Sequence, residues 1–288
     1  MRRLFFIASL AFSLATFVAD SSAQQDSSQQ DSTDQPVISA PAVPASIPPN
    51  QRSAYQARAL IQKGIQALGG DAYLNAKDLE EQGRTYSFYH GNPTSNGVFF
   101  WRFTEFPDKE RIELTAQRDV AEVFSGGKGY EVTYKGPHPI EKKDLDDYQR
   151  RHRFSLETIL RTWVNDPKVA LFYDGDALAG ALAAQKVTLI NAQDEAVSLY
   201  FDIDTNLPIR KSYSWRDPAD REKNTEEESY DNYRTVQGVM TCFNFTRYFN
   251  GDMQTERFIT SASYNQNLDQ TMFDPFSHYN PNKISKKH

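Results

Sequence analysis

Cysteine is almost absent from this sequence, because Cys242 is the only one among the 288 residues. A single thiol excludes an internal disulfide, a Cys-based zinc site and an iron–sulfur cluster. An excess of basic residues is absent too, since 32 Lys and Arg stand against 38 Asp and Glu and give a formal charge of −6. General nucleic-acid binders carry basic surfaces, so we expect no nucleic-acid partner.

Catalytic motifs are missing as well. The sequence holds no G-x-S-x-G, no H-E-x-x-H, no P-loop and no G-x-G-x-x-G that follows a strand and opens a helix. The five histidines are scattered, and the acidic clusters, such as Asp144 to Asp147 and Glu226 to Glu228, lack the glycine bend of a calcium loop. We therefore predict no catalytic residue, no metal site and no cofactor.

The N-terminus has the pattern of a secretory signal peptide. Arg2 and Arg3 precede an apolar run from Leu4 to Val18, and a small-x-small cleavage pattern ends at Ala23. The apolar run is shorter than the roughly 20 residues of a membrane-spanning helix. Residues 1–23 are therefore predicted to be removed on export, and we expect the mature protein in the periplasm.

The rest of the chain divides into three parts by composition. Residues 24–52 are rich in Gln, Ser, Asp and Pro, and such a segment buries too little apolar surface to fold, so a disordered linker is predicted. Residues 53–275 hold the periodic apolar patterns of one folded domain. Residues 276–288 are predicted to form an irregular C-terminal tail.

Two segments have helical periodicity. From Ala57 to Leu68, apolar residues recur at helical spacing, and Gly69-Gly70 then provides a C-terminal cap. A second helical interlude is predicted from Leu145 to Trp163. The Ala/Leu-rich segment 177–184 is open between helix and loop.

Most other segments alternate apolar and polar residues with a period of two, which is typical of half-buried antiparallel strands. We count nine or ten such strands, and no strand alternates with a helix as in a parallel sheet. The predicted fold class is mainly β with α: a large curved antiparallel sheet, a half-barrel, whose concave apolar face is covered by the helices.

Aromatic residues make up 13% of the chain, which exceeds what a modest core requires. Two interpretations stay open: a filled core without a ligand, or a cavity between sheet and helices that holds a lipophilic ligand. For the second interpretation, the predicted ligand-binding wall is a set of inward-facing residues on the strands: Phe99, Trp101, Phe103, Leu114, Tyr130, Leu199, Phe201 and Trp215.

The order of elements resembles the LolA/LolB-like outer-membrane lipoprotein-sorting family over residues 53–275, in particular its divergent bacterial branch. The matching motifs mark turns and strand starts: Leu68-Gly69-Gly70, Pro107-Asp108-Lys109-x-Arg111, Gly127-x-Gly129-Tyr130, Asp202-x-x-Thr205-x-Leu207-Pro208-x-Arg210 and Tyr230-x-x-Tyr233-Arg234-x-Val236-x-Gly238-Val239. The resemblance implies an incomplete barrel with helices lidding a hydrophobic cavity. It also implies an arginine that closes the lid, for which Arg58, Arg102 and Arg161 are candidates.

The predicted function is that of a periplasmic carrier, without catalysis, that holds a lipid or lipoprotein acyl chain and acts as a monomer. Envelope membrane proteins are candidate partners. The alternatives are a non-catalytic envelope scaffold with a filled core and a hydrolase acting on envelope lipids or glycans. The hydrolase would require a carboxylate beside His152. A small outer-membrane barrel is disfavoured because strand positions such as Arg102 and Lys211 are charged.

Overall fold

The computed structural model describes residues 41–277 and 279–280. The predicted signal peptide and residues 24–40 of the predicted linker lie outside the described residues. The described end of that linker forms a turn and the short 3-10 helix η1 (Pro49–Gln51) just before the first α-helix. The cleavage of the signal peptide and the linker's role stay predictions.

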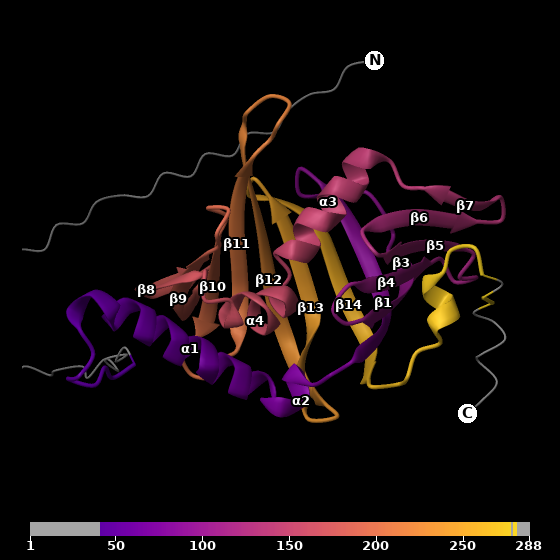
Figure 1. Cartoon of the computed structure of the whole chain (residues 1–288). Coiled ribbons are helices and arrows are strands. Elements are labelled where there is room, and N and C mark those ends of the chain that lie inside the picture. Colours follow the sequence, from indigo (N-terminus) through magenta and orange to yellow (C-terminus); the bar gives the residue numbers. More distant parts are fainter. Residues whose placement is uncertain (1–40, 278, 281–288) are drawn as a thin grey trace, which may run out of the picture. The chain divides into compact units, whose positions relative to one another are not determined.

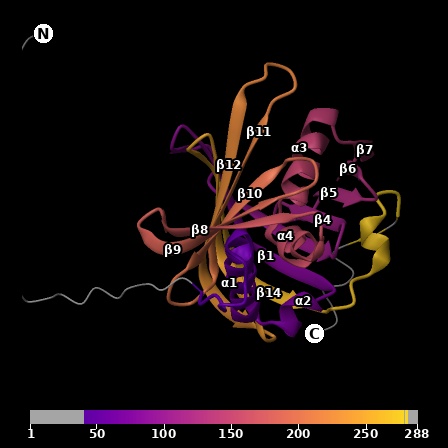
Figure 2. The same ribbon diagram turned by 60° about the vertical axis from the view of Figure 1, so that its left-hand side comes forward.

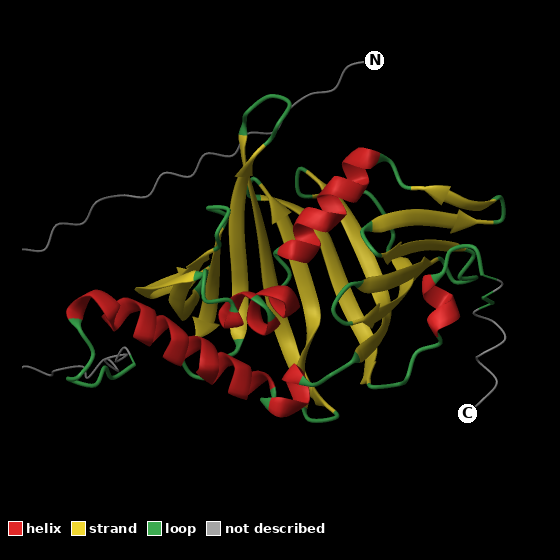
Figure 3. Cartoon of the chain, in the orientation of Figure 1, coloured by secondary structure: helices red, strands yellow, loops and turns green. Residues whose placement is uncertain are grey.

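One large antiparallel sheet forms most of the fold (Figure 1, Figure 3). Its strands follow the order β7-β6-β5-β4-β3-β1-β14-β13-β12-β11-β10-β9-β8, with β2 paired to β1, and the two outermost strands do not pair with each other. The strands are β1 (Asp78–Tyr89), β2 (Asn92–Pro93), β3 (Val98–Glu105), β4 (Lys109–Leu114), β5 (Val120–Ser125), β6 (Lys128–Thr133), β7 (Gly136–Pro139), β8 (Ala170–Ala179), β9 (Leu182–Ile190), β10 (Ala196–Asp202), β11 (Pro208–Arg216), β12 (Lys223–Val236), β13 (Val239–Phe249) and β14 (Asp252–Tyr264). The predicted fold class is confirmed, with more strands than the nine or ten expected.

The α-helices lie together on one side of this sheet, which we call the inner face (Figure 3). They are α1 (Arg52–Leu68), α2 (Asp71–Leu74), α3 (Lys142–Arg153) and α4 (Leu156–Arg161), and the 3-10 helix η2 (Trp163–Asn165) follows α4. The 3-10 helix η3 (Gln270–Phe273) lies on the other face. The predicted helical interlude is thus two helices. Ser155 separates them, because its side chain accepts a hydrogen bond from the Thr158 backbone N–H and caps α4.

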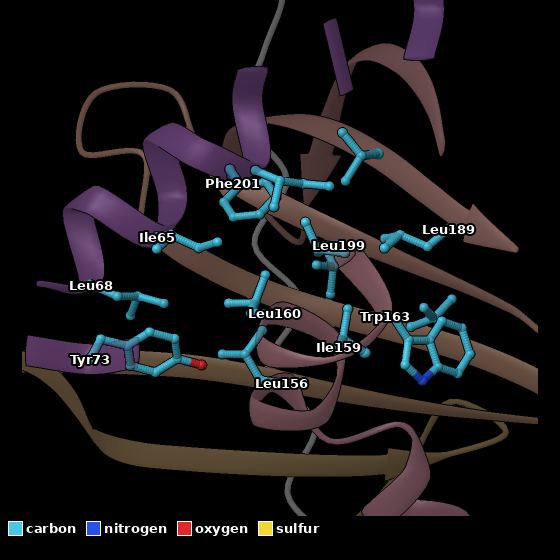
Figure 4. Packing of buried hydrophobic residues seen from close by; sticks show 14 of the residues in the cluster. Ile65, Leu68, Tyr73, Leu156, Ile159, Leu160, Trp163, Leu189, Leu199 and Phe201 are labelled. Carbon is cyan, nitrogen blue, oxygen red and sulfur yellow. The ribbon is translucent and has the colours of Figure 1, made fainter. Parts of the chain in front are cut away.

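Helix α1 covers the β8–β10 part of the inner face and fills it. Its predicted apolar stripe is buried along its whole length. Gly64 lies so close to β10 that an added Cβ would come within 2.3 Å of the Phe201 ring, so only glycine fits there. Together with α4, the helix buries a core that includes Ile65, Leu160 and Leu199 (Figure 4).

The Ala/Leu-rich segment is a β-hairpin rather than a helix or a loop. Leu178 pairs with Ala183 and Ala179 with Leu182, and Gly180 makes the turn with a φ of 66°. Small apolar side chains fit either a helix or a strand, so periodicity alone does not identify the hairpin. Figure 2 shows this hairpin projecting away from α3.

The outer face of β3 and β4 is covered by the C-terminal segment. Phe103 packs there against Met272 and Phe273 of η3. The Arg111 guanidinium donates a hydrogen bond to the Met272 carbonyl at 3.0 Å. The part of the chain after β14 therefore supplies a second, small core on the far side of the sheet from α1.

Candidate functional site

A cavity of about 970 Å³ lies between the inner face of the sheet and helices α2, α3 and α4. Its floor is formed by β1, β3, β4, β5 and β12–β14. This volume is at the upper end of the 300–1,000 Å³ typical of small-molecule sites. In Figure 1, α3 crosses in front of the strands that form the floor.

One end of the cavity is apolar and lies next to the core under α1 and α4. Its side chains come from seven different elements, from α1 through β14. They are Leu68, Tyr73, Leu79, Leu156, Tyr233, Met240 and Tyr264. Apart from the three tyrosine hydroxyl groups, these side chains offer a surface to hydrocarbon.

The remaining floor carries charges that are paired across strands. Arg102 on β3 forms ion pairs with Glu81, with an Nη1–Oε2 distance of 3.1 Å, and with Glu110. Burial alone would raise the pKa of Glu110, but the Arg102 guanidinium outweighs it and the pKa is lowered. On β11 and β12, the fully buried Lys211 pairs with Glu228 at 2.6 Å. These pairs neutralise charges that the sheet buries.

Arg247 and Arg257 also line the cavity, and neither forms an ion pair with another described residue. Arg257 on β14 lies over the Phe245 ring, with 5.1 Å between Cζ and the ring centroid. Arg247 on β13 donates a hydrogen bond to Thr255 Oγ1 at 3.1 Å. Burial and the nearby Arg102 lower the pKa of Arg257 to about 10, and burial and Arg151 lower that of Arg247.

Helix α3 spans the mouth of the cavity, and it is attached at both sides. Tyr148 stacks on Phe124 of β5 with ring centroids 3.5 Å apart, and Gln149 donates to the Gly127 carbonyl at 2.8 Å. On the other side, the Arg150 guanidinium lies 3.8 Å from the Trp215 ring centroid of β11. No residue of α3 is buried, so the helix is a thin cover rather than part of the core.

Of the eight predicted wall residues, Leu114 lines the cavity. On β3 the residues that line it are Phe100, Arg102 and Thr104. Their neighbours in the alternation, Phe99, Trp101 and Phe103, lie on the outer face. Phe99 is 40% exposed, Phe103 is in the small core with η3, and Trp101 packs against that core.

The other four predicted wall residues lie away from the cavity. Leu199 and Phe201 are fully buried in the core under α1. Trp215 packs against Tyr213, Phe249 and Arg150, and Tyr130 contacts Phe276 edge to face. Whether any of the eight contacts a ligand stays a prediction.

The three candidates for a lid-closing arginine all bind groups of the protein itself. Arg58 donates to the Val164 carbonyl at 3.2 Å. Arg161 donates to the carbonyls of Tyr73 and Ala76 at 2.7 and 2.8 Å, and Arg102 forms the pairs described above. Arg102 and Arg161 line the cavity, and Arg58 does not.

His152 lines the cavity and its ring stacks on Tyr148, but it forms no ion pair with any described carboxylate. Burial raises the pKa of the Cys242 thiol to about 12, which leaves the thiol unreactive at neutral pH. No group of described His, Cys, Asp and Glu residues has the arrangement of a metal site. None of the described helices is long and apolar enough to cross a membrane.

Two solved structures share the arrangement of the sheet and helices. A DUF1329 family protein from Desulfovibrio piger superimposes with a TM-score of 0.53 and 12% identity, over 76% of this chain and 97% of that one. A domain from Vibrio parahaemolyticus, assigned to outer membrane lipoprotein sorting, gives a TM-score of 0.51 and 10% identity, over 77% and 97%. The chain has a LolA-like fold.

The resemblance predicted from the sequence is therefore confirmed at the level of fold. At 10–12% identity these two structures establish the architecture and leave ligand and activity to other arguments. No protein-family model matches the chain, and no curated protein matches its sequence.

Proposed function

We propose that this LolA-like protein is a periplasmic carrier that binds the acyl chain of a lipid or lipoprotein non-covalently. The observation that carries the proposal is the cavity of about 970 Å³ with an apolar end. Apolar ligands enter such a space because hydrocarbon is removed from water. The LolA-like fold, which in one of the similar structures is assigned to lipoprotein sorting, supports the same reading.

The acyl chain would lie along the apolar end of the cavity. Leu114, the predicted wall residue that lines the cavity, is opposite Phe100 in the β3–β4 ladder and lies on the floor away from that end. The other seven predicted residues would act by supporting the sheet around the cavity. Carriage requires no bond to be made or broken, so the proposal includes no catalytic group. Loading and release would involve envelope membrane proteins as partners, and the carrier would work as a monomer.

The test begins with mass spectrometry of organic extracts from protein purified out of a native periplasm without detergent. Stoichiometric phospholipid or acylated peptide is expected. Protein that yields an empty extract and also takes up no added fluorescent fatty acid would favour the alternative of a filled-core scaffold.

A matched pair of variants tests whether the cavity is the binding site. Met240→Asp places a charge among the side chains of the apolar end and is expected to weaken fatty-acid uptake by at least about tenfold. Leu178→Asp introduces the same charge on the β8–β9 hairpin, where the residue is 70% exposed and outside the cavity. Uptake should be unchanged in this control, and equal losses in both variants would contradict the proposed site.

A further inference from the structure

Arg247 and Arg257 lie beside each other on the inner face of the sheet. In the β13–β14 ladder, Arg257 is opposite Phe245 and Arg247 is opposite Thr255. The two arginines are therefore diagonal neighbours on the same face, a relation that places side chains about 7–8 Å apart. Both side chains line the cavity.

Two carboxylates close to these arginines are already engaged. Glu228, opposite Arg247 in the β12–β13 ladder, pairs with Lys211 and accepts a hydrogen bond from the Tyr230 hydroxyl at 2.6 Å. Glu110 pairs with Arg102. Among the described residues, neither Arg247 nor Arg257 forms an ion pair. A guanidinium has five N–H donors, so both side chains retain donors for a ligand.

Nearby groups favour an anion over a cation at this position. Arg151 of α3 lies close enough to Arg247 to lower its pKa. Thr85 and Ser87 of β1 line the same part of the cavity and stand opposite Arg257 and Thr255 on β14. Their hydroxyl groups add hydrogen-bond donors. Two neighbouring carboxyl groups, Glu122 and Glu226, have pKa values raised by burial, and neither forms an ion pair with the two arginines among the described residues.

The arginines and the apolar side chains line one continuous cavity. A ligand that satisfies both must have a hydrocarbon chain and an anionic end. We propose that Arg247 and Arg257 bind the anionic head group, a carboxylate or a phosphate, of an amphiphile whose chain occupies the apolar end. Arg151 lies above the same head group. This inference rests on the proposed carrier function and adds the class of its ligand.

The experiment measures dissociation constants of the full chain for three probes with the same acyl chain. These are palmitate, 1-palmitoyl lysophosphatidate and the uncharged monopalmitoylglycerol. The two anionic probes are expected to bind about tenfold to a hundredfold more tightly than the uncharged one, the range for hydrogen bonds to charged groups. A preference for palmitate alone identifies a fatty acid, and a preference for the phosphate probe alone identifies a phospholipid.

Variants connect this preference to the arginines. Arg257→Met and Arg247→Met should each reduce the preference by about tenfold and leave the affinity for monopalmitoylglycerol unchanged. Arg257→Lys keeps the charge, preserves the fold if the methionine variant does not fold, and should retain part of the preference. The matched control is Arg234→Met, because Arg234 also lies over a phenylalanine ring, Phe243, but is exposed and outside the cavity.

Different results would overturn the head-group assignment and the carrier function. If the natural protein binds all three probes equally, or if the arginine variants keep the full preference, the head-group assignment is overturned while the carrier function stands. If Arg234→Met loses as much preference as Arg257→Met, the assignment is overturned too. If the natural protein binds none of the probes, the carrier function itself fails.

Discussion

The part of the sheet under α1 and the part under α3 are built from the same alternating strands but have different inner faces. On β9 and β10, the inward side chains are aliphatic or aromatic, such as Leu189 and Phe201, and are fully buried. On β3 and β4, the inward positions include Arg102 and Glu110. The helices follow the same division, because α1 buries a full apolar stripe and α3 buries no residue.

This difference separates the part of the sheet that forms the core from the part that holds the cavity. An apolar helix packs directly on an apolar inner face and leaves no space between them, because this burial removes hydrocarbon from water. A face with paired charges cannot be covered by an apolar helix without losing the hydration of those charges. The polar helix α3 therefore stays above the sheet, and the cavity persists beneath it. Three predictions test this difference between the two parts of the sheet.

The largest loss of stability is expected for Phe201→Ala. Removing a fully buried phenylalanine leaves a hole between β10 and Gly64 of α1, and such changes cost about 3–5 kcal/mol of the free energy of unfolding. Leu114→Ala, at the partly exposed cavity wall, should cost less than about 2 kcal/mol. Urea unfolding followed by circular dichroism measures both, and similar losses would show that the two parts of the sheet contribute equally to stability.

Smaller changes in the free energy of unfolding are expected at β12, which lies between the two parts of the sheet. Two neighbouring glutamates on this strand should change it in opposite directions. Burial would raise the pKa of Glu228, but Lys211 outweighs it and lowers the pKa. The stabilisation from this ionised carboxylate is present above the ordinary glutamate pKa of about 4.3 and is lost as pH falls through the lower folded value. Glu228→Gln leaves Lys211 as an uncompensated buried charge and should cost about 3 kcal/mol at pH 7.

Glu226 behaves in the opposite way, because burial raises its pKa despite the attraction of Arg247. The folded protein then holds the proton more tightly than the unfolded chain. Its stability therefore falls as pH rises from about 4.3 through the raised folded value. Glu226→Gln should stabilise the protein at pH 7 by less than Glu228→Gln destabilises it, and the gain should vanish near pH 4. Thermal unfolding at both pH values measures this, and a loss at pH 7 would contradict it.

The smallest effect on global stability is expected for Tyr148→Ala in α3. The stacked pair of Tyr148 and Phe124 contributes about 0.5–1.5 kcal/mol. The variant should increase amide hydrogen exchange in α3 and leave exchange in α1 unchanged, because the two helices do not share a core. Exchange followed by mass spectrometry tests this, and equal increases in both helices would show that they unfold together.

The fold could be predicted from the sequence because the apolar residues of most helices and strands recur with a clear period. The stripe from Ala57 to Leu68 and the glycines after it predict α1 correctly, and the alternating strands predict an antiparallel sheet. The β8–β9 hairpin was not predicted, since alanine and leucine suit helices and strands alike. The break at Ser155 was missed because the apolar spacing of α3 and α4 is nearly continuous.

The cavity wall was harder to predict than the fold. On β3, both alternating faces carry phenylalanine, so the choice between Phe100 and Phe103 depends on what covers each face. Phe103 is covered by Met272 and Phe273, which are more than 160 residues away along the chain. The prediction that Phe103 faces inward is therefore wrong, because a distant segment builds a second core on the outer face. A charged residue between aromatic ones, Arg102, was the available signal for the cavity side.

The position of β1 has a consequence for how this protein reaches its native state. Strand β1 lies between β3 and β14, so the middle of the sheet joins the beginning of the folded chain to its last strand. In this ladder Leu79 pairs with Tyr264. Contacts between residues so distant in sequence slow folding, because a large loop must close before they form. The strands from β1 to β7 join the strands from β8 to β13 only after β14 has been synthesised. Until then the edges of β1 and β13 are unprotected against pairing with other chains.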